Sequence, residues 1–133
     1  MTLSSQERDA IVAYRVEKAK ETIKEVDGIV SMGYWNNAAN RLYYSVYYIV
    51  SALMVKNGFR TNTHSGVRNL FTLHFVKTGL VNKESMRLYS HLFDFRLKSD
   101  YDDFFDLEEK DILPLIEEAK VFIHEIEQLI NEQ

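Results

Sequence analysis

The spacing of apolar residues predicts helices along nearly the whole chain. Between Ser4 and Gly33, apolar side chains recur every three or four residues, which is the period of one face of an α-helix. Ser4 and Glu7 form a capping-box pattern at the start of this segment, and Gly33 is a typical residue at a helix stop. The sequence therefore predicts a long first helix with one buried face.

The next segment is apolar on nearly all sides. It is predicted to begin at Asn36 or Asn37 and to end at Asn57 and Gly58, which favour helix termini. A helix without a polar face has to be surrounded by other elements. We expect this second helix to be the central and most buried element.

Three further helices follow. They are predicted to span residues 65–79, about 83–98, and a stretch that begins between Asp106 and Asp111 and ends near Glu132. Pro114 fits the first turn of a helix that begins at Asp111, but it would kink a helix that begins at Asp106. The predicted fold is all-α, a single domain over residues 1–133 built as an antiparallel four- to five-helix bundle.

Composition supports this fold class and excludes others. The 133 residues include one proline and five glycines, too few for a turn-rich β architecture. There is no cysteine, so neither a disulfide framework nor a thiolate metal site can form, and a reducing cytoplasm is the expected compartment. No apolar run reaches the length of a transmembrane helix, and no signal-peptide pattern opens the sequence. We expect a chain that is neither exported nor membrane-spanning.

Charge is distributed unevenly along the chain. Residues 28–99 hold nine Lys or Arg against two acidic residues, whereas residues 100–133 hold two against twelve. A positive middle segment favours contact with phosphates or with an acidic partner. The alternative is that the two segments neutralise each other within the fold.

Histidine spacing argues against a metal centre. None of the four histidines follows a glutamate by three residues, so the Glu-x-x-His pattern of di-iron bundles is absent. We expect no metal and no cofactor.

Arg96 is the strongest candidate functional residue. It continues the apolar face formed by Tyr89, Leu92 and Phe93, and a guanidinium on such a face requires a partner. Asp100 and Tyr101 follow within reach, and Lys98 adds a nearby charge. The sequence predicts a notch for a nucleotide or RNA phosphate here. The alternative is an ordinary ion pair between Arg96 and Asp100.

Five other residues are candidates for phosphate or nucleotide binding. They are Asn40, Tyr44, His64, Ser65 and Arg68. An amide on a buried helix needs a partner, either a backbone group or a ligand, whereas the tyrosines of the second helix could simply belong to the core. The start of the third helix offers free amides to an anion, although Thr63 or Ser65 could serve only as an N-cap.

Three segments together resemble the HEPN domain family of small all-helical proteins. They are AANRLYYSVYYIVSALM, THSGVRNLFTLHFVKTG and YSHLFDFRLKSDYDD. The resemblance covers nearly the whole chain. It implies a two-fold dimer and, in many members, a metal-independent ribonuclease site in which an arginine is followed by a histidine after four to six residues. It also implies pairing with a minimal nucleotidyltransferase, in some cases as toxin and antitoxin.

In this motif Arg96 matches the arginine, and Tyr101 stands after four intervening residues. A tyrosine exchanges protons poorly near neutral pH, because its usual pKa is about 10. Three functions therefore remain open. The first is a binding module paired with a nucleotidyltransferase, and the second is an RNA-cleaving toxin that uses Arg96 with Asp100 or Tyr101. The third is a non-catalytic scaffold. Tyr101 also resembles the tyrosine near this motif that partner nucleotidyltransferases adenylylate in some toxin members of the family. The resemblance therefore implies a further role for Tyr101, as a modified side chain.

The aromatic content predicts a homodimer. Eight tyrosines, eight phenylalanines and one tryptophan exceed what a small bundle needs in its core. We expect an interface on the fourth predicted helix, around Leu92 and Phe95.

Overall fold

The computed structural model describes residues 3–103 and 105–132, and its helices are joined by short connections. The helical elements are α1 (Ser5–Ser31), α2 (Trp35–Lys56), α3 (His64–Phe71), the π-helical turn η1 (Thr72–Val76), α4 (Lys83–Tyr101) and α5 (Glu109–Asn131). No strand occurs in the described ranges. The all-α helical bundle predicted from the sequence is confirmed.

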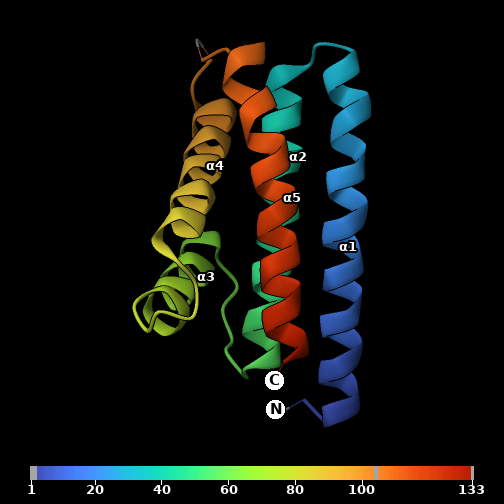
Figure 1. The fold of residues 1–133 in the computed structure, drawn as a ribbon, viewed down its shortest axis with the longest axis vertical. Helices are drawn as coiled ribbons and strands as arrows, with labels where there is room; N and C mark the ends of the chain where they lie inside the picture. Colours follow the sequence, from blue (N-terminus) through green and yellow to red (C-terminus); the bar gives the residue numbers. More distant parts are fainter. Residues whose placement is uncertain (1–2, 104, 133) are drawn as a thin grey trace.

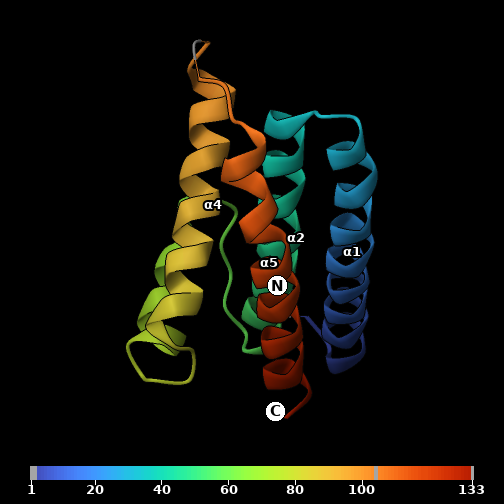
Figure 2. The ribbon, with the colours of Figure 1, turned by 45° about the horizontal axis from the view of Figure 1, so that its top comes forward.

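Helix α2 lies at the centre of the bundle. It packs against α1, α3, α4 and α5. Figures 1 and 2 show α1 and α4 on opposite sides of the pair formed by α2 and α5, with α3 beside the lower part of α4. Leu42, Tyr43 and Ile49 of α2 are fully buried. The predicted central position of the second helix is therefore confirmed.

The predicted helix boundaries hold best where side chains cap the ends. The Ser4 hydroxyl accepts a hydrogen bond from the Glu7 amide, and the Glu7 carboxylate accepts one from the Ser4 amide. This capping box opens α1, as the sequence predicts. Hydrogen bonding to Ser4 also lowers the pKa of Glu7.

Two predicted helices differ from those observed. The segment 65–79 divides into α3 and η1, and at this point the Thr72 hydroxyl donates to the Arg68 carbonyl. Helix α4 continues three residues beyond Lys98, to Tyr101. Both differences arise at positions without a strong stop signal.

Helix α5 begins at Glu109, inside the predicted range. The start is set by a second capping box, in which the Glu108 amide donates to Asp111 at 2.9 Å. Pro114 is consequently the sixth residue of the helix. Pro114 therefore lies after the first turn of α5, whereas a start at Asp111 would have placed it within the first turn. None of the helices in the described ranges is long and apolar enough to span a bilayer.

Asn36 ties the connection between α4 and α5 to the start of α2. Its Nδ2 donates to the Phe105 carbonyl at 3.0 Å, and its Oδ1 accepts from the Leu107 amide at 2.8 Å. Both bonds join residues about seventy positions apart in the chain. Asn36 therefore holds the acidic connection against the bundle.

We expect Asn36→Ala to lower the free energy of unfolding by about 1–3 kcal/mol, because two backbone groups lose their partner. Urea unfolding measures this change. Asn37→Ala is the matched control, since Asn37 is exposed on the same turn and should change stability by less than about 0.5 kcal/mol. Equal effects of the two substitutions would contradict the role assigned to Asn36.

Candidate functional site

Arg96 lies on the inner side of α4, against the tyrosines of α2. Its side chain is 15% exposed, and its Nε lies 3.3 Å from Oδ2 of Asp100. The guanidinium carbon lies 5.6 Å from the ring centre of Tyr43 and 5.9 Å from that of Tyr44. Cation–π attraction and the ion pair together fix the position of this charge. The contact with Asp100, one turn along the same helix, was expected from the sequence.

His64 reaches the same tyrosines from the first position of α3. Its Nδ1 is 2.7 Å from the Tyr43 hydroxyl, a hydrogen bond across the α2–α3 contact. Its ring centre lies 4.4 Å from that of Tyr47 and 5.7 Å from that of Tyr44. We call the group formed by Arg96, Asp100, His64, Tyr43 and Tyr44 the notch. It joins three helices, with Tyr47 at its border.

Electrostatics favour a neutral imidazole in the notch. Burial lowers the pKa of His64, the positive charge of Arg96 lowers it further, and Asp100 partly opposes both effects. Burial also raises the pKa of Tyr43 well above its usual value, against the opposing effect of Arg96. Both partners of the bond between His64 and Tyr43 are therefore uncharged near neutral pH. Arg96 then supplies the positive charge among these three side chains.

Asn40 lies beside the notch and binds a neighbouring side chain. Its Oδ1 accepts from Nε and Nη2 of Arg41 at 3.1 and 2.9 Å. The guanidinium carbon of Arg41 lies 5.2 Å from the ring centre of Tyr44, on which Arg96 also lies. The partner of Asn40 is thus a side chain, which differs from the backbone or ligand partners expected. Arg41 brings a second guanidinium to Tyr44.

The other predicted residues lie around the notch in different settings. Thr63, not Ser65, caps α3, through a bond from the Gly66 amide at 2.9 Å. The guanidinium of Arg68 lies 4.2 Å from the ring centre of Phe93. The Lys98 amine lies 5.6 Å from the Phe105 ring. The binding roles expected of Ser65, Arg68 and Lys98 stay predictions.

Tyr101, the last residue of α4, is 79% exposed. Among the described residues, no hydrogen bond or ring contact joins it to Arg96. His64 instead is the proton-exchanging side chain that lies against the same tyrosine rings as Arg96. The role of Tyr101, catalytic or as a modified residue, stays a prediction.

Two residues of this region, Tyr43 and Arg41, were not among the predicted site residues. Tyr43 had been assigned to the core, and it is fully buried, but its hydroxyl also holds His64. Arg41 is half-buried and contacts Asn40 and the Tyr44 ring. The string Asn-Arg-x-Tyr-Tyr carried the signal, because it places four polar side chains within one turn and a half of the buried helix. In the described ranges, no three His, Asp or Glu side chains are grouped so as to hold a metal ion.

Comparison with known proteins identifies relatives along most of the chain. The family model of the HEPN domain matches residues 12–129. A UPF0332 protein of Thermotoga maritima is 35% identical over 126 residues, covering 95% of this chain and 96% of the relative. A protein of Methanocaldococcus jannaschii named "Putative toxin MJ0142" is 24% identical, covering 86% of this chain and 78% of the relative. A second protein of that organism, named "Putative toxin MJ0605", is 26% identical, covering 88% of this chain and 87% of the relative.

Proposed function

Because the chain belongs to the HEPN domain family, we propose that it binds a phosphate group of RNA or of a nucleotide in the notch. The observation that carries this proposal is the way in which Arg96 is held. Asp100 lies against the inner nitrogen Nε, and within the described residues neither terminal nitrogen makes a hydrogen bond. Those two nitrogens form the planar fork that binds phosphate oxygens in pairs.

His64 supplies a second contact for an anion. Its Nδ1 is engaged by Tyr43, so Nε2 is the ring nitrogen left for a ligand. A bound phosphate would favour the protonated imidazole and raise the pKa that burial and Arg96 now lower. The rings of Tyr44 and Tyr47 add faces on which a base can stack. The notch therefore combines charge, hydrogen bonding and stacking.

A toxin-like role accords with the names of two relatives. The resemblance to HEPN proteins suggests a minimal nucleotidyltransferase as the partner and a pair of the toxin–antitoxin type. In this arrangement the notch holds the nucleic acid or nucleotide, and the partner controls access to it. The excess of acidic residues after the notch, over residues 102–132, offers such a partner negative charge to contact.

A metal-independent ribonuclease is the second candidate function. The observation that favours it is that His64 lies against the same tyrosine rings as Arg96. The fold thus supplies a histidine, although the sequence motif has Tyr101 at its histidine position. Arg96 would stabilise the charge that develops on the phosphate, and His64 would accept the proton of the attacking 2′-hydroxyl. The 2′-oxygen would bond to phosphorus as the bond to the 5′-oxygen breaks, and the leaving 5′-oxygen would take a proton from the protonated imidazole or from water. Binding and cleavage use the same notch. They differ in whether His64 exchanges a proton.

An assay of RNA degradation and growth tests the proposed function. Expression of the wild-type chain alone is expected to arrest growth, and Arg96→Ala is expected to relieve the arrest. Purified protein incubated with total RNA shows whether degradation accompanies the arrest. Arrest by the Arg96→Ala variant at equal protein level would contradict a role for the notch.

We also expect a homodimer, with Phe95 but not Leu92 at its interface. Leu92 is fully buried in the bundle, so it cannot contact a second copy. Phe95 is half-buried, with its ring centre 4.3 Å from that of His91 at the surface of α4. Light scattering should give twice the chain mass of 15.6 kDa at micromolar concentration, and Phe95→Asp should reduce it toward the monomer. A monomeric wild type over that range would refute this prediction.

A further inference from the structure

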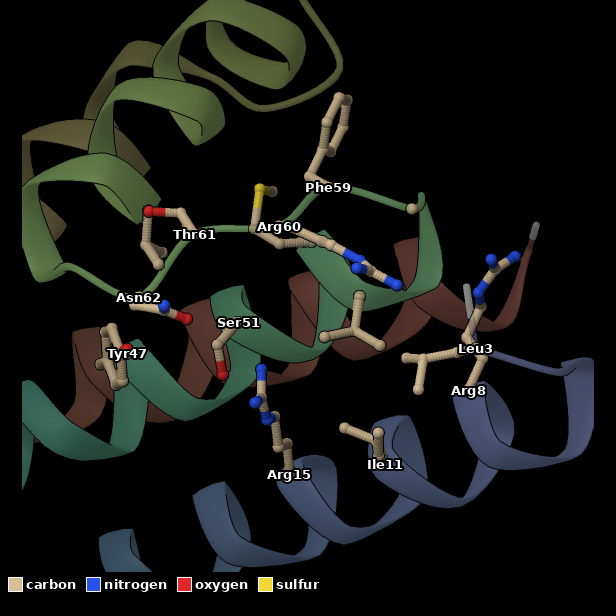
Figure 3. Close-up of a pocket in the computed structure, with 14 residues that line it drawn as sticks. Leu3, Arg8, Ile11, Arg15, Tyr47, Ser51, Phe59, Arg60, Thr61 and Asn62 are labelled. Atoms are coloured by element: carbon tan, nitrogen blue, oxygen red, sulfur yellow. The ribbon is translucent and has the colours of Figure 1, made fainter. Parts of the chain in front are cut away.

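A cavity of about 640 Å³ lies between the first half of α1, the second half of α2 and the segment that follows α2. Figure 3 shows Arg15 and Ile11 rising from α1 toward Tyr47 and Ser51 of α2, with Asn62 on the connecting segment. Arg8 and Arg60 complete the charged part of the lining. Among the described residues no acidic side chain lines this cavity. We call it the arginine groove.

Among the described residues, the lack of acidic lining side chains distinguishes this groove from the cavity between α4 and α5. This second cavity, of about 480 Å³, is lined by Glu84, Glu117, Glu118 and Glu125 together with Arg87 and His91. The two hollows therefore have opposite electrostatic character. Of these two cavities, the arginine groove is the one that suits an anionic ligand.

Arg8 and Arg15 make no ion pair with any described residue. No acidic residue stands three or four positions from either of them in α1. They lie seven residues apart on one helix, which corresponds to about 10.5 Å along its axis. Such a separation is too long for a single phosphate group to bridge. It suits a ligand with several phosphates in succession.

Tyr47 connects the arginine groove to the notch. It lines the groove, and its ring centre lies 4.4 Å from that of His64. Burial raises the pKa of Tyr47, and the charges of Arg15 and Arg96 both oppose that shift, so the hydroxyl lies within the field of both sites. A ligand that leaves the notch past His64 therefore meets Tyr47 and then Arg15.

We propose that the arginine groove binds the continuation of a single-stranded nucleic acid whose neighbouring phosphate occupies the notch. Proteins that hold single strands combine a row of positive charges with aromatic faces for the bases. Here Arg8 and Arg15 provide the charges and Tyr47 the face. This inference rests on the proposed function, and it names the ligand as a strand that extends beyond one nucleotide.

Binding of two ligands of different length tests the proposal. One is a single-stranded RNA of about 12 nucleotides, within the usual range of site sizes, and the other is a dinucleotide that fills the notch alone. The variant is Arg8→Gln with Arg15→Gln, and Arg87→Gln is the charge control in the other cavity. Arg8→Gln alone and thermal melts guard against a folding defect. The double variant should lose about tenfold in affinity for the long RNA, keep its affinity for the dinucleotide, and show a slope of log affinity against log salt smaller by about 0.7 for each lost contact.

The outcomes separate this inference from the function beneath it. If the double variant keeps its affinity and salt slope for the long RNA while Arg96→Met loses affinity, RNA binding in the groove is refuted and phosphate binding in the notch is supported. Unchanged binding of both ligands in Arg96→Met would refute the notch instead. Weaker ATP binding in the double variant, with long-RNA binding intact, would indicate that the groove binds a free nucleotide. It would refute the proposal that the groove binds a single strand.

Discussion

Replacing Arg96 with methionine is expected to lower the affinity for single-stranded RNA and for ATP by about ten- to a hundredfold, because charged hydrogen bonds contribute about 1.5–3 kcal/mol. Methionine retains a flexible apolar stem against Tyr43 and Tyr44, so packing changes little. Arg96→Lys should also weaken binding, since lysine keeps the charge but lacks the bidentate fork. Fluorescence titration with labelled RNA measures the affinities of the wild type, Arg96→Met and Arg96→Lys.

Stability distinguishes a binding arginine from a structural one. The side chain of Asp100 is 37% exposed, so losing its partner leaves a carboxylate that water can still solvate. Thermal unfolding of Arg96→Met should therefore stay close to wild type. Arg87→Met, on an exposed position of the same helix, is the matched control for both measurements. A large loss of stability with unchanged binding would identify Arg96 as part of the packing only.

Local interactions explain which parts of the fold could be predicted. The capping box of Ser4 and Glu7 involves residues three apart, and the pair of Arg96 and Asp100 lies one turn apart on a helix. Such contacts follow from helical geometry alone. The burial of α2 followed from its apolar composition, since no orientation of that helix presents a polar face.

The end of α4 shows why the site was predicted only in part. A helix that stopped at Lys98 would have left Tyr101 free to turn back toward Arg96. Because α4 continues to Tyr101, five residues of helix rotate that side chain by about 140° from Arg96, whereas Asp100 is rotated by only about 40°. The same extension that preserves the ion pair therefore carries Tyr101 to the surface. A shift of three residues in one boundary changes which side chains meet.

The contact between His64 and the tyrosines depends on packing between helices. His64 and Arg96 are 32 positions apart, and they reach the same tyrosine rings only because α3 and α4 both pack on α2. A sequence pattern contains no measure of that arrangement. The resemblance to HEPN proteins named an arginine and a histidine, but it placed the histidine after the arginine in the chain. In this fold a histidine that precedes the arginine contacts the same tyrosine rings.

His64→Gln separates the two candidate functions of the notch. If the chain cleaves RNA, loss of a general base should lower the cleavage rate by about 10²- to 10⁴-fold, while RNA affinity falls much less. Glutamine retains hydrogen bonding toward Tyr43, so the fold should persist. Gel analysis of RNA in the presence of a metal chelator measures the rate. Tyr101→Phe is the comparison at the motif position, and a cleavage loss in that variant with an active His64→Gln would return the role to Tyr101.

The pH dependence has opposite sign in the two cases. A general base works in its neutral form, and the pKa of His64 is lowered by burial and by Arg96. Cleavage should therefore rise with pH below His64's ordinary value of about 6.5 and become level near neutrality. A notch that only binds phosphate gains from a protonated imidazole, so its affinity should instead increase as the pH falls through the same range. His64→Gln should flatten whichever profile the wild type shows, and a wild-type profile that survives this substitution would exclude His64 from both functions.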